Sequence, residues 1–287
     1  MTRLGVLSDI HGNLPALEAV ITDMAAFAVD HVVVAGDSVN WGPFSPQVMD
    51  LITSRQWALI RGNNEYYLLD HQTPRAPESW QAFTLPPMLY EQLGEYRTRL
   101  IASLPDTLSL RFRDAPPIRV FHGVPGNPWT AIHPWMRDDQ VREHLASVEE
   151  TTVIGGHSHI PMERQVDGWH LFNPGSVGVP LDGQFCASYM VLEGDASGWR
   201  LIAQRRVPFD VEVVLREFER LHYIERCGIQ GRLVVEEFRT AQMRLDPFIA
   251  WMKAHHPGEA MTDALLDAFL QSDIGQYLPE QYRVMLV

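Results

Sequence analysis

Cysteine, basic residues and long apolar runs are all scarce in this sequence of 287 residues. Only Cys186 and Cys227 occur, without a pairing pattern or a zinc spacing, which argues against a disulfide-stabilised secreted scaffold. No apolar stretch has the length of a membrane span. Lys and Arg number 23 against 36 Asp and Glu, and the resulting formal charge of −13 argues against a general nucleic-acid surface.

The beginning of the chain indicates a compartment. Met1–Leu7 leads directly into a strand-like segment and lacks a charged-then-apolar leader, so we expect a cytoplasmic protein with no membrane partner.

An apolar fraction of 46% with 21% charged residues is typical of a globular protein. An acidic exterior is compatible with a phosphate substrate, because bound metal ions can capture phosphate locally. It favours small substrates over long polyanions.

The first third of the chain alternates between apolar strand patterns and helical patterns. Strands are predicted at 4–7, 31–35 and 57–60, and helices at 14–27 and 46–54. Each strand runs into a polar loop before its helix begins. This alternation predicts βαβ units around a parallel sheet, and the valine-rich second strand suits a position covered on both faces.

The remainder of the chain divides into a strand-rich part and a helical part. Residues 66–105 are predicted to be mainly helical, and the later strands are expected at 108–112, 118–122, 152–154, 162–166, 170–172, 187–192 and 200–204. We expect one domain over 1–210, followed by a helical extension over 211–287 that packs on it. In that extension Val214, Leu215, Phe218 and Leu221 share one helical face. A cap on the core, a dimer contact and a substrate lid all fit this face.

Polar side chains follow five of the predicted strands. They are carboxylates, a carboxamide and imidazoles: Asp9, His11, Asp37, Asn63, His122, His157 and His159. Ligands gather at the carboxyl ends of strands in open α/β sheets. Mixed imidazole and carboxylate ligands suit Mn, Fe, Zn, Co or Ni, and seven of them exceed what one ion needs. Two ions that share a carboxylate fit the set and would clamp a phosphoryl displacement.

The order of these motifs carries a resemblance. The motifs are Asp9-Ile10-His11, Gly36-Asp37, Gly62-Asn63, His122 and Gly156-His157-Ser158-His159. In this order the sequence resembles the calcineurin-like metallophosphoesterase superfamily from Leu4 to about Asp210. The stretches Ser8–Asn13, Gly36–Pro46 and Asn173–Val177 resemble its small bacterial and archaeal phosphodiesterase branch.

The resemblance implies an α/β fold with two packed β-sheets flanked by helices, an α/β/β/α sandwich. It implies a first metal ion held by Asp9, His11 and His159, and a second held by Asn63, His122 and His157, with Asp37 bridging. The two ions would be divalent transition metals, Mn foremost for activity, with Fe, Zn, Co or Ni as alternatives. Asp37, Asn63 and His122 would serve catalysis around a metal-bridging hydroxide that attacks the ester.

The third motif departs from the family pattern. Many members carry a histidine after the metal-binding asparagine, near the leaving oxygen, where this sequence has Asn64. An asparagine cannot act as a general acid, and the loss of a general acid lowers the rate roughly a hundredfold or more. The sequence therefore favours phosphodiesters and activated aryl esters over alkyl monoesters. His133, in the loop after His122, is the candidate substitute acid.

Four residues are candidates for substrate contact: Asn13, Trp41, Asn64 and Asn173. Asn13 and Asn173 would contact phosphate or orient the metal ligands, and turn roles fit both residues equally well. Trp41, together with Trp129 and Trp135, would form an aromatic wall for an aryl group or base, unless the three rings serve packing.

The expected enzyme is a metal-dependent phosphoric ester hydrolase acting on a small phosphate ester. A phosphomonoesterase for phosphoprotein or nucleotide is the alternative within enzymes, and a metal-binding scaffold on the same fold is the alternative outside them. All seven ligand positions hold suitable residue types, which favours the enzyme. A homo-oligomer formed through the C-terminal helices is a further expectation.

Overall fold

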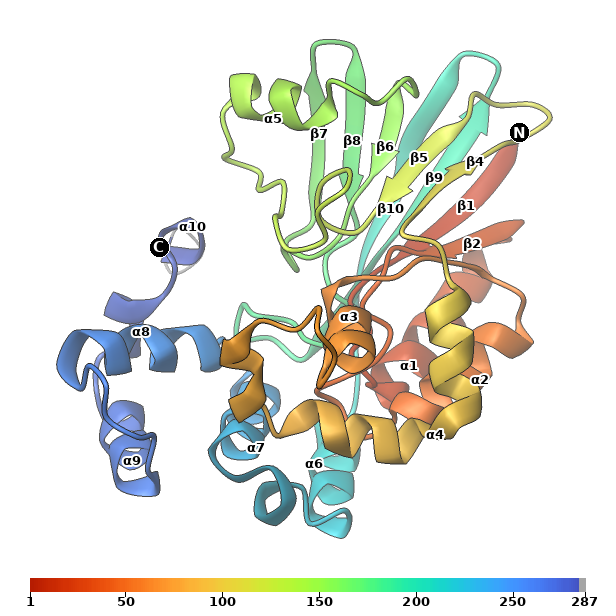
Figure 1. Cartoon of the computed structure of the whole chain (residues 1–287). Helices are drawn as coiled ribbons and strands as arrows, with labels where there is room; N and C mark the ends of the chain where they lie inside the picture. Colours follow the sequence, from red (N-terminus) through yellow and green to blue (C-terminus); the bar gives the residue numbers. More distant parts are fainter. Residues whose placement is uncertain (284–287) are drawn as a thin grey trace.

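The computed structural model describes residues 1–283 and contains two five-stranded sheets that lie face to face (Figure 1). The first sheet has the order β10-β9-β1-β2-β3, with β1 (Thr2–Leu7), β2 (His31–Val34), β3 (Ala58–Leu59), β9 (Cys186–Asp195) and β10 (Gly198–Pro208). The second has the order β4-β5-β6-β8-β7, with β4 (Thr107–Leu110), β5 (Ile118–Phe121), β6 (Thr152–Ile154), β7 (Met162–Val166) and β8 (Trp169–Asn173). The prediction of two packed sheets is confirmed.

The parallel strands of the first sheet place their carboxyl ends together. β1 pairs in parallel with β2, and β2 with β3, while β9 and β10 extend the sheet with antiparallel pairs. In the second sheet β5, β6 and β8 are parallel neighbours. Both sheets therefore direct several strand ends towards one edge of the sandwich, where the loops meet.

The hydrophobic core has a layer between the sheets and a layer under the helices. Leu4, Val6 and Val33 pack between the sheets against Ile118 and Ile154, and all five are essentially buried. Successive side chains on a strand point to opposite faces, so the intervening residues of β1 and β2 face the helices instead. The strands of this sheet are thus covered on both sides, which explains the continuous valine run of β2.

Helices cover the outer faces of both sheets. Those beside the first sheet are α1 (Leu14–Met24), α2 (Ser45–Ser54), α3 (Asn63–Asp70) and α4 (Leu85–Ser103), with short 3-10 turns at Ala25–Phe27 and Glu78–Ala82. The second sheet is covered by α5 (Asp138–Leu145), which the sequence pattern did not predict. Only Val141 and Leu145 of this short helix are buried, so its apolar periodicity is too weak to detect.

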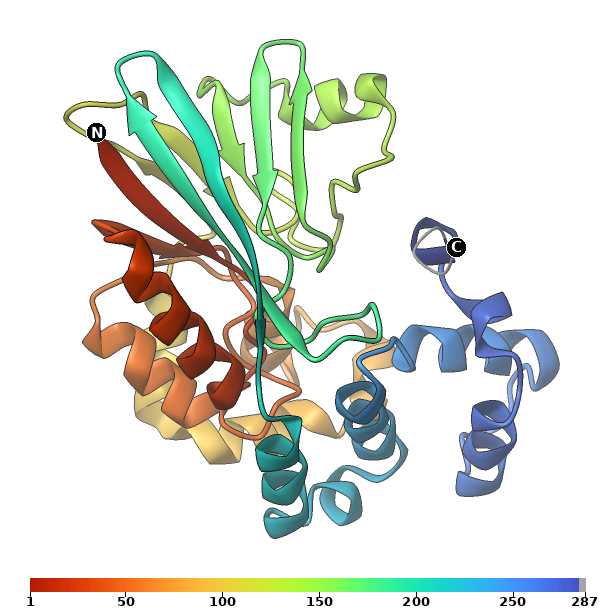
Figure 2. The ribbon, with the colours of Figure 1, turned by 180° about the vertical axis from the view of Figure 1, so that it is seen from behind.

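The helical extension follows β10. It contains α6 (Val211–Arg220), α7 (Tyr223–Thr240), α8 (Leu245–His255), α9 (Asp263–Leu270), the 3-10 turn Ile274–Tyr277 and α10 (Glu280–Arg283). Val214 and Phe218 of α6 share a buried cluster with Leu85 and Met88 of α4. The helices α8 and α9 form a separate cluster with α7, and Figure 2 shows them standing away from the sheets. Among residues 1–283, no helix is long and apolar enough to cross a membrane.

Candidate metal centre

All seven predicted ligands lie together at the common edge of the two sheets. Asp9 and His11 follow β1, Asp37 follows β2, and Asn63 begins α3 just after β3. His122 follows β5, and the pair at 157 and 159 follows β6. Side chains from five strand ends of both sheets thus meet in one place, as their positions in the sequence predicted.

Asp9, His11 and His159 form the first group. Their ligand atoms lie within 4.8 Å of one another. The Nε2 atoms of His11 and His159 are 3.2 Å apart, and Oδ1 of Asp9 lies 3.3 Å from Nε2 of His159. This carboxylate oxygen is buried and has no hydrogen-bond partner among the described residues. A buried anionic oxygen that faces imidazole nitrogens is the environment that a metal cation satisfies.

Asp37, His122 and His157 form the second group, again with ligand atoms within 4.8 Å. Oδ2 of Asp37 lies 3.3 Å from Nε2 of His122 and 3.7 Å from Nε2 of His11. One oxygen atom therefore faces both groups, as a bridging carboxylate must. Oδ1 of Asn63 lies 3.0 Å from Nε2 of His122, so the carboxamide also adjoins the second group.

Backbone carbonyls fix the orientation of three of the imidazoles. Nδ1 of His122 donates to the carbonyl of Ala35 at 2.7 Å, and Nδ1 of His159 donates to that of Val179 at 2.8 Å. Nε2 of His157 donates to the carbonyl of Trp129 at 3.1 Å. Because a carbonyl only accepts, each ring carries a proton on the outer nitrogen, so the inner nitrogen is the one that would face a metal ion.

Five of the seven residues have a left-handed backbone: Asp9 (φ 55°), His11 (φ 48°), Asp37 (φ 53°), His157 (φ 66°) and His159 (φ 59°). This conformation is uncommon outside glycine and costs on the order of 1–3 kcal/mol per residue. Cross-loop hydrogen bonds maintain it, including those from the amide of Asp9 to the carbonyl of Gly36 and from His11 to Asp37. A side chain at Gly62 would place its Cβ 2.2 Å from Oδ1 of Asp37, so only glycine fits there.

Two neighbours of Asn63 hold Asp37 in place. Glu65 accepts hydrogen bonds from the amides of Asp37 (3.0 Å), Ser38 (2.8 Å) and Gly62 (2.6 Å). Asn64 donates its side-chain amide to Oδ2 of Asp37 at 2.6 Å, and its backbone amide donates to Oδ1 at 2.8 Å. The carbonyl oxygen of the Asn64 side chain accepts from Asn40 at 2.7 Å. Asn64 lines the cavity described below, but one end of its side chain holds Asp37 and the other end is held by Asn40.

Burial and mutual charge set the protonation of these groups. Burial lowers the pKa of His11 and of His157 to about 4, so both are neutral at pH 7. Burial also acts to lower the pKa of His122, but Asp37 and Asp9 outweigh it and raise that pKa to about 10. In return, His122 helps to hold the pKa of Asp37 below its usual range despite burial. A bound cation would replace this imidazolium as the partner of the carboxylates.

Comparison with known proteins identifies the family. A family model described as a calcineurin-like phosphoesterase superfamily domain matches residues 2–197. The chain belongs to this superfamily. It is therefore a metal-dependent phosphoester hydrolase, as the resemblance implied.

Relatives of this calcineurin-like phosphoesterase come from archaea and bacteria. An uncharacterised protein of Methanocaldococcus jannaschii is 27% identical over 214 residues, which are 67% of this chain and 83% of the relative. The phosphodiesterase YfcE of Escherichia coli is 27% identical over 212 residues, 68% of this chain and 89% of the relative. Crystal structures of a metallophosphoesterase from Sphaerobacter thermophilus and a hypothetical protein from Pyrococcus horikoshii share the fold, with TM-scores of 0.66 and 0.69 at 23% and 18% identity. The matches cover 84% and 85% of this chain, respectively, and 100% of each crystallised chain.

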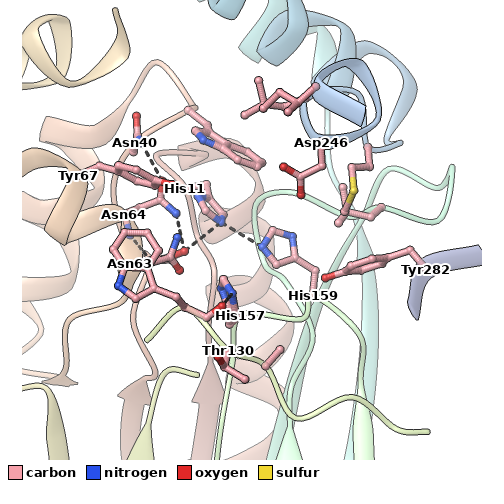
Figure 3. Close-up of a pocket in the computed structure, with 18 of the residues that line it drawn as sticks. His11, Asn40, Asn63, Asn64, Tyr67, Thr130, His157, His159, Asp246 and Tyr282 are labelled. Carbon is pink, nitrogen blue, oxygen red and sulfur yellow. Dashed lines mark hydrogen bonds and ion pairs between the residues drawn. The ribbon is translucent and has the colours of Figure 1, made fainter. Parts of the chain in front are cut away.

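A cavity of about 970 Å³ opens beside the candidate metal centre of this phosphoesterase (Figure 3). The ring of Trp41 stacks on that of His11 with centroids 4.9 Å apart, and Trp129 and Trp135 also line the cavity. The exposed fractions of Trp129 and Trp135 are 40% and 38%, which is high for tryptophan. The three predicted aromatic residues thus share one cavity, and two of them are free to contact a ligand.

His133 lies in the cavity wall but does not suit the acid role at neutral pH. Its ring stacks on Trp135 at 5.4 Å and meets Tyr282 edge-on at 5.5 Å. Burial lowers the pKa of His133, so the imidazole is neutral at pH 7 and has no proton that it readily gives up.

Asn13 and Asn173 do not line the cavity. Asn13 is buried, caps α1 by accepting from the amide of Ala16 at 3.1 Å, and donates to the carbonyl of Gly178 at 2.7 Å. Asn173 is also buried and donates to the carbonyl of Gly156 at 2.8 Å. We therefore correct the prediction of substrate contact for these two residues, because their amides hold the ligand-bearing loops together.

Several residues that line the cavity were not predicted from the sequence. Tyr67 is four residues after Asn63 on α3, and this helical spacing was a usable signal. Asp246 and Tyr282 reach the cavity from the helical extension (Figure 3). The amphipathic pattern of the extension left a substrate lid open as one of three roles, but no sequence motif singled out Asp246 or Tyr282.

Proposed function

We propose that this protein hydrolyses small phosphate esters, phosphodiesters above all, with two divalent transition-metal ions. The proposed ligands are Asp9, His11, Asp37, Asn63, His122, His157 and His159. The observation that carries this proposal is the position of Oδ2 of Asp37, which lies 3.7 Å from His11 of one group and 3.3 Å from His122 of the other. Separate sites would not need a carboxylate oxygen between them.

Two such ions, when bound, supply Lewis-acid activation of water and of the phosphoryl group. The chain supplies preorganisation. Asp37 joins the two ligand groups, Glu65 and Asn64 hold Asp37, and outer carbonyls keep His122 and His159 in the tautomer that binds metal. We expect Mn to support the highest activity, because the ligands combine imidazole with carboxylate and carboxamide oxygens.

The preference for diesters rests on two features of the cavity. Both ends of the Asn64 side chain are hydrogen-bonded, so the residue neither protonates a leaving group nor has freedom to move towards one. Among the described lining residues there is no Lys or Arg, so nothing on the wall would neutralise the second charge of a monoester dianion. The relative YfcE, named a phosphodiesterase, agrees with this preference. A homo-oligomer through residues 211–287 and a cytoplasmic location stay predictions.

The test is a metal-reconstitution screen. Protein stripped of metal is reloaded with Mn, Co, Ni, Fe or Zn, and rates are measured on bis(p-nitrophenyl) phosphate and on p-nitrophenyl phosphate. We expect hydrolysis with at least Mn and a higher kcat/KM for the diester. Equal rates for wild type and Asp37→Asn with every metal would refute the proposal.

A series of aryl ethyl phosphates tests the missing acid. Without a proton donor the rate should fall steeply as the pKa of the leaving phenol rises. A flat dependence would show that another residue protonates the leaving oxygen.

A further inference from the structure

Outside the metal centre, the cavity wall is largely aromatic and carries acidic side chains, with no Lys or Arg among its described residues. Its aromatic residues from both parts of the chain include Trp41, Tyr67, Phe83, Trp129, Trp135 and Tyr282. Outside the metal centre, the charged residues among the described lining are Asp246 and Glu280. A second anionic group of a substrate would find no partner on such a wall. A cationic group would find both π faces and carboxylates.

Asp246 is the more informative of the two carboxylates. It lies in the first turn of α8, and Figure 3 shows its carboxylate pointing into the cavity on the side of His11 and His159. It is open to the cavity, yet it has no hydrogen bond or ion pair with any residue that the structure describes. Surrounding protein raises its pKa, and Lys253 only partly opposes this effect. Its exposed carboxylate can therefore pair directly with a cation that enters the cavity.

Several of the aromatic rings that line the cavity contact one another. Tyr67 meets Trp129 edge-on at 5.0 Å, and Phe83 lies 5.5 Å from Tyr67. On the side of the metal centre, the ring of Trp41 stacks on that of His11, and both residues line the cavity. Aromatic faces combined with a free carboxylate are the usual surroundings of a bound ammonium group.

We propose that the preferred substrates are phosphodiesters of an ammonium-bearing alcohol, with the phosphate at the metal centre and the cation between Asp246 and the aromatic wall. This inference rests on the proposed function, since it places the phosphate at the same centre. It assigns Asp246 to substrate selection and gives the helical extension a part in the site.

An acidic residue in the first turn also stabilises its own helix through the helix dipole. That role predicts no selectivity between substrates. Glu225 offers a matched control, because it lies in the first turn of α7, is exposed and does not line the cavity.

A pair of esters isolates the cation. p-Nitrophenyl phosphorylcholine and p-nitrophenyl 3,3-dimethylbutyl phosphate have the same leaving group and nearly the same shape, and differ in a quaternary nitrogen against a carbon. For the Mn-loaded wild type we expect kcat/KM to be roughly tenfold higher for the choline ester. Asp246→Asn should lower this ratio about fivefold, whereas Glu225→Gln should preserve the ratio and the rates on both esters.

Binding provides a readout without turnover. Tryptophan fluorescence of the Mn-loaded protein gives Kd values for phosphorylcholine and 3,3-dimethylbutyl phosphate, and the same selectivity is expected. A ratio at or below one in the wild type, or an unchanged ratio in Asp246→Asn, would overturn the inference. Hydrolysis of both esters without selectivity defeats the inference alone, and selective binding without hydrolysis by any metal-loaded form defeats the proposed function alone.

Discussion

The two walls of the cavity are built in opposite ways. On the core wall, buried polar groups engage one another, and Glu65 alone accepts three backbone amides. On the extension wall the lining is mostly apolar, and Asp246 has no hydrogen bond or ion pair with any of residues 1–283. The core wall also has strained backbone at five of the proposed ligands, whereas α8 is a regular helix.

This contrast separates chemistry from selection. Metal ligands need fixed positions, because small displacements change coordination, and the interlocked loops of the core supply that rigidity. Substrate groups vary, and a wall that stands on a separate helical cluster can change without disturbing the ligands. We therefore expect substitutions on the core wall to affect catalysis and metal content, and substitutions on the extension wall to affect selectivity or local stability.

The largest effect is expected at Asp37. Asp37→Asn keeps the size of the side chain but removes the charge that faces both ligand groups. We expect kcat on bis(p-nitrophenyl) phosphate to fall about a thousandfold or more, with loss of at least one bound ion. Mass spectrometry measures the number of bound metal ions, and steady-state kinetics measures kcat.

The control for Asp37→Asn is Asp139→Asn, an exposed carboxylate paired with Arg137 outside the centre. It should leave both the rate and the metal content unchanged. Full activity in Asp37→Asn would remove the basis for a shared carboxylate.

The second-largest effect is expected for substitutions that destabilise each of the two regions separately. Ile154→Ala creates a cavity between the sheets, and Phe248→Ala creates one in the cluster of α8 and α9. Each substitution should lower the free energy of unfolding of its own region by about 4 kcal/mol. Hydrogen exchange should speed up throughout the sheets in Ile154→Ala, and only within the extension in Phe248→Ala. Identical changes in both variants would show that the chain unfolds as one cooperative unit.

Sequence patterns predicted the core wall well because its signals are local. Asp9 and Asp37 follow apolar strands of one sheet, and parallel strands of one sheet end at one edge, so the convergence of these two residues followed from topology. His122 follows β5 of the second sheet and joins them because the two sheets direct their strand ends towards the same edge. The extension wall gave no such signal. Asp246 reaches the site only through the packing of α7 and α8, and this depends on contacts distant in sequence. The roles of Asn13 and Asn173 also needed coordinates, because an asparagine amide serves a turn or a ligand equally well.

The third effect is a pH dependence at Glu237. This buried residue of α7 accepts the amides of Arg244 and Leu245 at the start of α8, and its second oxygen Oε2 has no partner among the described residues. Burial raises its pKa from 4.5 to about 7. Between these values the folded state retains a proton that the unfolded state loses, so the free energy of unfolding should fall as pH rises through this window, by up to about 3 kcal/mol.

Urea unfolding between pH 4.5 and 8 measures this dependence. Glu237→Gln removes the titrating group and should flatten the decline. If the variant and the wild type lose stability in parallel, the carboxyl group of Glu237 is not its source.

The smallest effect is expected at Asn64. Asn64→Ala deletes the hydrogen bond to Oδ2 of Asp37 and leaves Asn40 without its partner. Outer residues of this kind typically contribute 10- to 100-fold in metal affinity or rate. Titration of the metal-free variant with Mn should show a weaker affinity for the metal. The selectivity for the choline ester over the dimethylbutyl ester should stay at its wild-type value. A change in selectivity without a change in metal affinity would place Asn64 on the substrate instead.

The most direct test of the account is the location of metal in crystals of the Mn-loaded protein. Anomalous scattering at the manganese edge is predicted to give two peaks in each chain, one beside Asp9 and His159, the other beside His122 and His157, with Asp37 in contact with both. A single peak, or peaks that Asp37 does not join, would contradict it.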